Sequence, residues 1–186
     1  MAYSLQDAER IDTVPFEKIH APILEFLPTK PSTFLDLGAG TGRDAAFLAA
    51  AGHTVLAIEP NDVLREFGES RHTSSRIRWL NDSLPDIFRL QEKPFDFIWL
   101  AGVWAFLELD QRTNALNRLA DFSTLGTRMM VSLKHDPRAS TIRADDTIAM
   151  AASNGFRLIH RAKTGSVQAA NEIAGVTWTK LVFEQA

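Results

Sequence analysis

One carboxylate and three glycines are the residues of this sequence whose types and spacing best suit ligand binding. Asp36 stands two residues before Gly38, which opens the alternating run Gly38, Gly40 and Gly42. Glycine accepts positive φ and has no Cβ, so such a run lets a ligand approach the backbone closely. A carboxylate beside the turn suits a cationic ligand better than a phosphate. The segment therefore predicts a turn that binds a positively charged ligand.

Two other ligands of glycine-rich turns fit this spacing less well. A phosphate-binding P-loop needs a lysine directly after its last glycine, and here Arg43 follows Gly42 with no lysine behind it. The dinucleotide fingerprint needs a small residue three positions after its second glycine, and that position is also Arg43. A dehydrogenase therefore remains a weaker alternative.

Strand patterns and helical patterns alternate along the chain, and they must position this turn. Thr41, Asn61 and Asp110 are expected to cap helices. Apolar β-rich runs predict strands at 34–37, 54–59, 77–80, 95–100, 127–134, 156–163 and 176–183. Helical spacing predicts helices at 16–27, 43–51, 61–70, 110–126 and 145–154, whereas the linker 164–175 shows no helical pattern.

This order predicts an α/β fold with a doubly wound, mostly parallel sheet. The linker before the last strand is too short for a crossover, so the last two strands are expected to be antiparallel. Glu59 ends the second strand, and Asp82 follows the third. Since ligands bind outside the carboxyl ends of parallel strands, both carboxylates are expected on the same edge as Asp36.

The composition excludes several classes of function. The chain has 186 residues, a net charge of -3 and no cysteine. Disulfides, thiolate metal sites and cysteine nucleophiles are therefore excluded, and no basic field argues for binding nucleic acid. The polar start and the absence of a long apolar run predict a cytoplasmic protein without a membrane partner.

The sequence resembles the class I S-adenosylmethionine-dependent methyltransferases, and small bacterial members without an assigned substrate most of all. The resemblance rests on Asp36 with its three glycines, on Glu59 and on Asp82, and it runs from about residue 30 to the end. It implies a three-layer αβα Rossmann-like sandwich, with seven strands in the order 3-2-1-4-5-7-6. It also implies one methyltransferase domain over 1–186, in which residues 1–30 form a helical cover and 31–186 the core.

The cofactor implied by the resemblance is S-adenosylmethionine, which leaves as S-adenosylhomocysteine. Asp36 would attract the sulfonium and the α-ammonium group, Glu59 would bind the ribose hydroxyls and Asp82 the adenine amino group. The cofactor-binding residues are expected to be Asp36, Gly38, Ala39, Gly40, Glu59, Pro60, Asp82, Ser83, Leu84 and Ala101.

Methyl transfer needs alignment more than acid or base catalysis, so a catalytic base is optional. His135 follows the fifth strand and is the candidate base, although a histidine held by its own turn is an equally simple explanation. Tyr3, Trp104, Phe106 and Lys134 are expected on the substrate side. No metal is expected, because the fourth strand ends without the carboxylate of metal-dependent catechol methyltransferases.

Three functions stay open for a chain of this kind. The first is methyl transfer to an oxygen or nitrogen of a small molecule, by a monomer or homodimer. The second is the same reaction on a protein or RNA. The third is a noncatalytic binding domain that keeps the fold.

Overall fold

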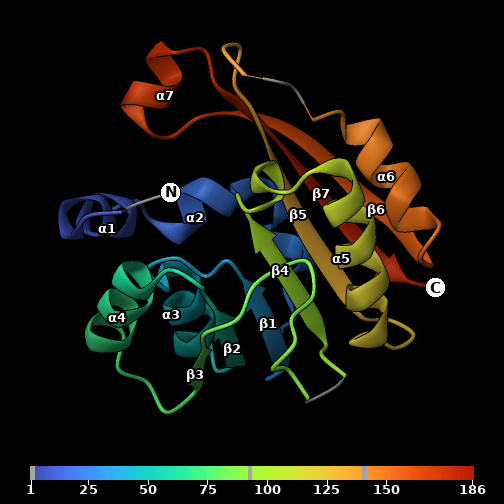
Figure 1. The fold of residues 1–186 in the computed structure, drawn as a ribbon, viewed down its shortest axis with the longest axis horizontal. Helices are drawn as coiled ribbons and strands as arrows, with labels where there is room; N and C mark the ends of the chain where they lie inside the picture. Colours follow the sequence, from blue (N-terminus) through green and yellow to red (C-terminus); the bar gives the residue numbers. More distant parts are fainter. Residues whose placement is uncertain (1–2, 92–93, 140–141) are drawn as a thin grey trace.

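A computed structural model describes residues 3–91, 94–139 and 142–186, so the first two residues of the expected N-terminal cover lie outside it. These residues form a seven-stranded sheet in the order β3-β2-β1-β4-β5-β7-β6 (Figure 1). All neighbours are parallel except β7, which is antiparallel to both β5 and β6. The predicted sheet and its antiparallel end are confirmed. The strands are β1 Thr33–Leu37, β2 Thr54–Ile58, β3 Ile77–Leu80, β4 Phe97–Ala101, β5 Arg128–His135, β6 Phe156–Gly165 and β7 Thr177–Gln185.

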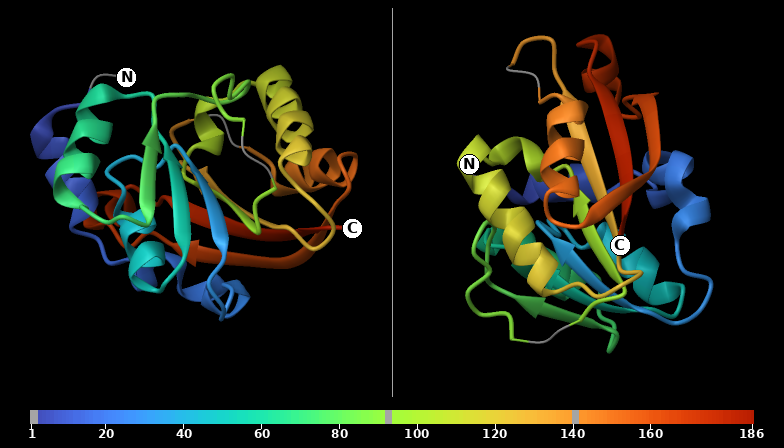
Figure 2. Two further views of the ribbon diagram at one scale, coloured as in Figure 1. Left: turned by 90° about the horizontal axis from the view of Figure 1, so that it is seen from below. Right: turned by 90° about the vertical axis from the view of Figure 1, so that its right-hand side faces the viewer.

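Helices cover the sheet on both faces, which makes three layers (Figure 2). One face carries α2, η1, α3 and α4, and we call it the α3 face; α5 and α6 cover the other, the α5 face. α1 packs on α4 instead of on the sheet. The helices are α1 Leu5–Asp12, α2 Phe16–His20, η1 Ala21–Phe26, α3 Arg43–Ala50, α4 Asp62–Arg71, η2 Trp104–Phe106, α5 Leu109–Asp121, α6 Ala144–Ala152 and α7 Ala169–Ile173.

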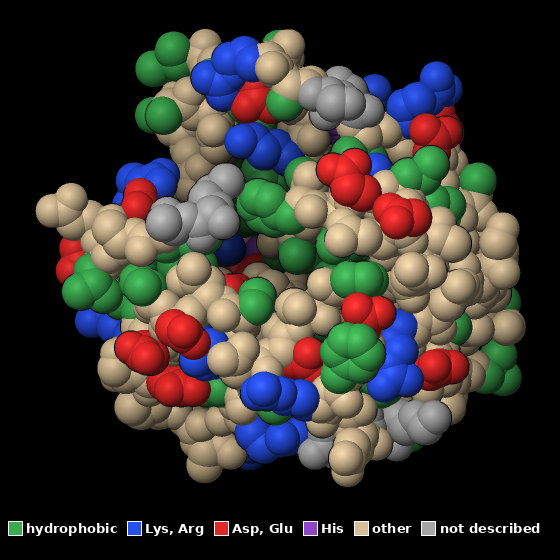
Figure 3. Space-filling view, viewed as in Figure 1, with side chains coloured by type: hydrophobic (Ala, Val, Ile, Leu, Met, Phe, Trp, Pro, Cys, Tyr) green, Lys and Arg blue, Asp and Glu red, His purple; other side chains and the backbone are tan. Residues whose placement is uncertain are grey.

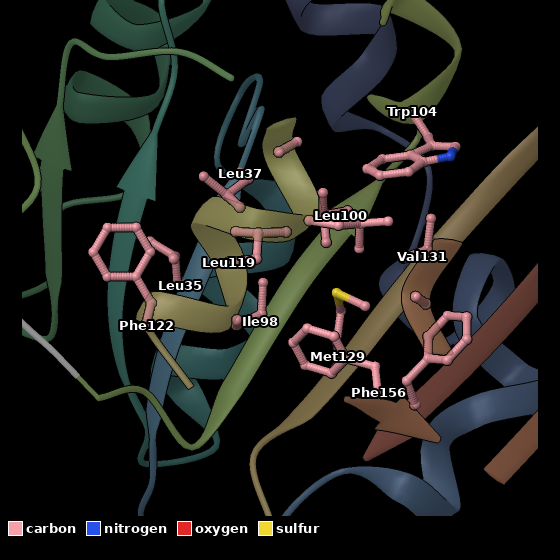
Figure 4. Close-up of a cluster of buried hydrophobic side chains, with 14 of the residues drawn as sticks. Leu35, Leu37, Ile98, Leu100, Trp104, Leu119, Phe122, Met129, Val131 and Phe156 are labelled. Carbon is pink, nitrogen blue, oxygen red and sulfur yellow. The ribbon is translucent and has the colours of Figure 1, made fainter. Parts of the chain in front are cut away.

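Alternation along β1 divides the core between the two faces. Leu35 and Leu37 join the larger cluster under α5, which Figure 4 shows with side chains from β4 and β5. Phe34 faces the other way into the smaller cluster under α3. Because side chains alternate in a strand, Asp36 also points to the α3 face. This places one carboxylate of the glycine segment in an apolar layer.

Two predicted helix caps are wrong. Gly42 is the N-cap of α3 with φ 76°, and no side chain bonds the first turn, so Thr41 does not cap it. Glu108 and Gln111 form the capping box of α5, and Asp110 lies inside its first turn. A negative charge there still stabilises the helix through its dipole.

Two predictions of helix content are also wrong. The helix expected at 16–27 is divided into α2 and the 3-10 segment η1, where Pro22 has no N–H to continue an α-helical ladder. The linker 164–175 contains α7, which was not expected. Asn171 donates a side-chain hydrogen bond of 2.7 Å to Gln168 there, a local contact that supports one turn without an apolar period.

Candidate functional site

The glycine turn after β1 has the geometry that its sequence predicts. Gly38, Gly40 and Gly42 all have positive φ, at 68°, 58° and 76°. The N–H groups of Gly38 and Ala39 both donate to the Ile58 carbonyl, at 2.9 and 3.0 Å, which fixes the turn to the end of β2. The turn is therefore held in place by backbone hydrogen bonds of the protein itself.

The three glycines face different surroundings. A Cβ on Gly38 would lie 2.9 Å from Val103, and a Cβ on Gly42 would lie 2.6 Å from the Trp79 ring. At Gly40 the nearest atom would be the carbonyl oxygen of Gly38, at 4.0 Å. Gly38 and Gly42 therefore allow protein packing, whereas Gly40 is the position that leaves room for a ligand.

Glu59 lies next to this open position. Its Oε2 accepts a hydrogen bond from Gly40 N at 2.9 Å, and its Oε1 accepts one from Asn61 N at 2.8 Å. Burial raises the pKa of Glu59, while the two backbone bonds and the Arg65 charge oppose that shift. The carboxylate is thus oriented by two backbone amides on the floor of the site.

The N-terminal segment reaches the same place. Burial raises the pKa of Tyr3, and the charges of Glu59 and Asp7 raise it further. His72 bonds Asp12 at 2.8 Å, and Arg43 donates to the Ile11 carbonyl at 3.2 Å. These contacts connect α1 to α4 and to the start of α3. The described part of the predicted cover therefore borders the glycine turn.

Asp36 is a buried carboxyl group with an unsatisfied oxygen. The residue is 2% exposed, and its Oδ2 has no hydrogen-bond partner among the described residues. Burial raises the pKa of Asp36 well above 3.8, and the neighbouring Asp44 charge raises it further. A buried acceptor without a donor is costly, so this group is suited to a ligand that supplies a cation.

Sequence reasoning missed a second buried carboxylate, Asp44. Its Oδ2 accepts from Trp99 Nε1 at 3.0 Å and bonds His20 Nε2 at 2.8 Å, and its Oδ1 pairs with Arg43 at 2.7 Å. The charges of His20 and Arg43 hold the pKa of Asp44 below its usual range in spite of burial. Its place in the first turn of α3 was visible in the sequence, but its partner 24 residues upstream was not. Asp44 therefore serves the fold.

Asp82 lies beyond the end of β3, which pairs with β2. Its Oδ1 accepts from Ser83 N at 2.9 Å and its Oδ2 from Arg89 N at 2.7 Å, so the carboxylate also fixes its own loop. Ser83 is exposed, and Leu84 is half-buried against the larger cluster. Asp36 thus lies next to the last residue of β1, and Glu59 and Asp82 follow the neighbouring strands β2 and β3 at the same edge of the sheet.

The candidate base lies apart from Asp36. His135 follows Leu133 on the α5 face, where its Nε2 bonds Thr179 Oγ1 at 2.8 Å. It lines a cavity of about 370 Å³ with Arg161 and Lys163. Burial lowers the pKa of His135, and the two cations lower it further. The structure therefore does not bring His135 to the face of the sheet that Asp36 occupies.

The predicted substrate-side residues differ in exposure. Trp104 is fully buried, and its Nε1 donates to Thr147 at 3.2 Å, so it belongs to the core. Phe106 is 61% exposed at the end of η2. Lys134 Nζ lies 3.6 Å from Asp136, and Ala101 is half-buried at the end of β4. Of these side chains, Phe106 and Lys134 remain accessible to an acceptor.

The molecular surface is hollowed above these residues. Figure 3 shows a depression at the centre of the face, between α2, the turn after β1 and the end of β4, with charged side chains of both signs at its floor. A separate cavity of about 460 Å³ lies beside Pro85, Phe88 and Arg118, away from the glycine turn. Within the described ranges, no group of three or more metal-ligating side chains is arranged to hold a metal ion. No helix among those residues is long and apolar enough to cross a membrane.

Comparison with known proteins agrees with this geometry. The methyltransferase domain family matches residues 34–124, which include the glycine turn, Glu59 and Asp82. No curated protein sequence matches the chain. Solved structures match this chain in fold, but their sequence identities are too low to show a shared function.

Three of these structures cover nearly the whole chain. A TehB-like S-adenosylmethionine-dependent methyltransferase from Corynebacterium glutamicum is 22% identical over 95% of this chain and 92% of its own, with a TM-score of 0.71. A Burkholderia thailandensis 1,6-didemethyltoxoflavin N1-methyltransferase, with its substrate and S-adenosylhomocysteine bound, is 16% identical over 97% and 82%, with a TM-score of 0.74. The N-methyltransferase NodS from Bradyrhizobium japonicum, bound to S-adenosylhomocysteine, is 18% identical over 97% of both chains, with a TM-score of 0.73. Residues 34–124 therefore match the methyltransferase domain family, and the chain as a whole has the fold of the class I S-adenosylmethionine-dependent methyltransferases.

Proposed function

We propose that this protein binds S-adenosylmethionine at the carboxyl edge of its sheet and transfers the methyl group to an oxygen or nitrogen of a small molecule. The observation that carries the proposal is the pair of carboxylates at the glycine turn. Asp36 is buried with an unsatisfied oxygen, and Glu59 is held by the N–H of Gly40, where the turn is open. The pair suits a ligand with a cationic end and a hydroxylated ring.

Each carboxylate has capacity left for its part of the cofactor. An ionised carboxylate has about four lone-pair sites, and Glu59 uses one on each oxygen for backbone amides. The remaining two sites suit the two ribose hydroxyls. Asp36 has a free Oδ2 for the α-ammonium group, and its charge would also favour the sulfonium.

The other cofactor-binding residues follow from their places at the strand ends. Asp82 keeps lone pairs for the adenine amino group after bonding its own loop. Ser83 and Leu84 lie beside it. The half-buried Ala101 at the end of β4 leaves room for the methionine part. The proposed binding set is completed by Gly38, Ala39, Gly40 and Pro60.

The chain has to align the acceptor and keep water away from it. S-adenosylmethionine supplies a methyl group activated by its sulfonium sulfur. The chain's part would be to hold the acceptor atom in line with that methyl group, and the proton of an O–H or N–H acceptor would pass to solvent. Tyr3, Phe106 and Lys134 are proposed to border the acceptor. His135 faces the other side of the sheet, so no base step is assigned to it.

Small acceptors are favoured by the kind of enzyme that shares this fold. Similar structures include the toxoflavin-precursor enzyme and a magnesium protoporphyrin IX methyltransferase from Synechocystis, both named for small-molecule substrates. A protein or RNA acceptor and a noncatalytic domain are the alternatives that turnover experiments would reveal.

Calorimetric titration of S-adenosylhomocysteine tests the proposal. Glu59→Ala is expected to weaken binding about tenfold to hundredfold, because hydrogen bonds to a charged group are lost. Glu66→Ala, on an exposed position of α4, is the matched control and should bind like wild type. Since Glu59 also holds two backbone amides, thermal unfolding of each variant must show that the fold survives. Absence of binding to wild type, or unchanged binding in Glu59→Ala, contradicts the proposal.

Turnover is then measured as S-adenosylhomocysteine release with a panel of small amines and phenols. Release that depends on one of these acceptors supports the small-molecule proposal. Release only with a protein or RNA acceptor would move the protein to the second function.

A further inference from the structure

The cavity of about 370 Å³ beside His135 is lined by polar side chains that the proposed function does not use. Three adjacent strands contribute to it. β5 supplies His135, β7 supplies Thr177 and Thr179, and β6 supplies Arg161 and Lys163. The cavity therefore brings together basic and hydroxyl groups that are far apart in the sequence.

The register of the sheet explains why these side chains meet. Lys163 pairs with Thr179, and Thr179 pairs with Leu133. Leu133 belongs to the larger core cluster, so this row of side chains points to the α5 face. Thr177 and His135 form the next pair, two residues further toward the carboxyl edge, and point the same way. One face of three strands is thus polar exactly where the apolar core ends.

The cavity lies above the end of β4, at the carboxyl edge of the sheet. Ala101 ends β4 and pairs with Ser132, whereas β5 continues to His135. The start of α6 supplies the opposite wall through Arg143 and Asp145, and α6 packs on β6. A ligand in the cavity would therefore lie between the sheet and a helix.

The charges that line the cavity do not balance. Three cations, Arg143, Arg161 and Lys163, and one carboxylate, Asp145, are among its described lining residues, and three minus one leaves a net charge of +2. Arg161 Nη1 lies 2.7 Å from Asp145 Oδ1. Arg143 has a looser contact with Asp146, at 3.8 Å. Lys163 has no ion pair or hydrogen bond within the described ranges.

The unbalanced charges act on His135. Burial lowers the pKa of His135, and Lys163 and Arg161 lower it further. Its Nε2 bonds Thr179 Oγ1 at 2.8 Å, whereas its Nδ1 has no hydrogen-bond partner among the described residues. A bound anion would offset the two cations and favour the protonated imidazole, in which both ring nitrogens are donors.

We infer that this cavity binds phosphate, as the free ion or as the monoester of a small molecule. A phosphate group carries close to two negative charges at neutral pH and has three strong acceptor oxygens. A carboxylate would supply half of that charge. Arg161 uses one of its five N–H donors on Asp145, so its guanidinium still has donors for a phosphate oxygen. Lys163 and the exposed Thr177 supply further donors.

The volume and the position of the cavity agree with a second ligand site. Sites for small molecules commonly enclose roughly 300–1,000 Å³, which is more than a free phosphate needs. The cavity is on the opposite face of the sheet from Asp36. The inference therefore does not depend on the proposed methyl transfer.

NMR of the histidine rings tests the inference on the whole chain. With ¹³C-labelled histidine, the His135 resonance is identified by its loss in His135→Gln. Inorganic phosphate should shift this resonance in a saturable way and should raise the pKa of His135. Chloride at the same ionic strength is the reference and should do neither. Absence of a saturable shift with phosphate would overturn the inference.

Two variants and a matched control show whether the response comes from the cavity. Lys163→Gln and Arg161→Gln each remove one exposed cation, and each should weaken phosphate binding about tenfold, as for a hydrogen bond between charged groups. Lys30→Gln removes the same charge from an exposed position before β1, at the opposite edge of the sheet, and should bind phosphate like wild type. Thermal unfolding confirms that each variant is folded. Equal effects of all three variants would overturn the inference, because they would show a general effect of net charge.

Calorimetry distinguishes the sources of the phosphate group. Tighter binding of glycerol 3-phosphate than of inorganic phosphate would assign the cavity to a phosphorylated small molecule, and the reverse order would assign it to the free ion. Acetate should bind more weakly than both. Acetate that binds as tightly as phosphate would contradict the assignment. None of these measurements uses S-adenosylhomocysteine, so failure of the proposed function would leave their result unchanged.

Discussion

Asp36→Asn is expected to stabilise the free protein and to weaken its binding of S-adenosylhomocysteine. Asp36 is 2% exposed, and burial raises its pKa in the folded state well above 3.8. At a pH between 3.8 and that raised value, the unfolded chain has released the proton and the folded chain still holds it. Unfolding is then favoured as pH rises, so this carboxyl group lowers stability at neutral pH.

The size of the effect follows from the linkage of one proton. The difference in unfolding free energy between wild type and Asp36→Asn should change by about 1.4 kcal/mol per pH unit inside this window, in favour of the variant. Below pH 3.8 Asp36 is protonated in both the folded and the unfolded wild-type chain, and above the raised pKa it has lost the proton in both. Outside the window, the difference in unfolding free energy between wild type and Asp36→Asn is therefore constant. The full change in unfolding free energy per pH unit is expected, because Asp36 is buried and solvent does not screen its charge.

Binding should respond in the opposite direction. The α-ammonium group of S-adenosylhomocysteine prefers the ionised carboxylate, so binding to wild type should release a proton inside the same window and tighten by up to tenfold per pH unit. Asp36→Asn should bind more weakly and release no proton at this site.

Urea unfolding from pH 4 to pH 8 gives the stability, and titration in two buffers of different ionisation enthalpy counts the protons. Asp86→Asn, exposed in the segment after β3, is the control and should follow wild type in both assays. Parallel stability profiles for wild type and Asp36→Asn would refute the argument, because they would mean that the carboxyl group has an ordinary pKa in the folded state.

Two further predictions concern neighbours of Asp36. Gly40→Ala should cost about 1–2 kcal/mol of stability, because the residue has a left-handed φ of 58°, and it should weaken ligand binding. Gly42→Ala should lower the midpoint of urea unfolding much further, because its Cβ would lie 2.6 Å from Trp79. Equal unfolding midpoints for the two variants would contradict the different surroundings of the two glycines. Asp44→Asn should destabilise the fold by about 3–5 kcal/mol in urea unfolding, since it leaves the buried His20 and the half-buried Arg43 without their carboxylate. A loss below about 1 kcal/mol would show that the cluster is not structural.

The sheet was predictable because its signals are local. The apolar runs, the alternation of strands and helices and the short final connection predict a mostly parallel sheet with an antiparallel end, and the resemblance to a known family implied the observed strand order. The wrong predictions of helix caps are at positions where contacts within one turn outweigh the general capping preference of a residue type. Gly42 caps α3 in place of Thr41, and a capping box at Glu108 moves the start of α5 before Asp110. The backbone and side-chain geometry within a single turn decides both caps, and residue type alone does not predict that geometry.

Only part of the proposed site could be predicted from the sequence. The turn, Asp36 and Glu59 follow directly from spacing in the sequence. The pairing of Asp44 with His20 gave no such signal, because the two residues are 24 positions apart and meet only in the folded chain. Long-range pairing of this kind has no counterpart in composition or periodicity.

The contrast between Asp36 and Asp44 shows why residue type cannot separate structural from functional carboxylates. Both are buried aspartates on one face of the sheet, eight positions apart in the sequence. Asp44 is surrounded by His20, Arg43 and Trp99, and its pKa falls; Asp36 has an unpaired oxygen, and its pKa rises. Folding has therefore given one carboxylate its partners and left the other carboxyl group with an unpaired buried oxygen.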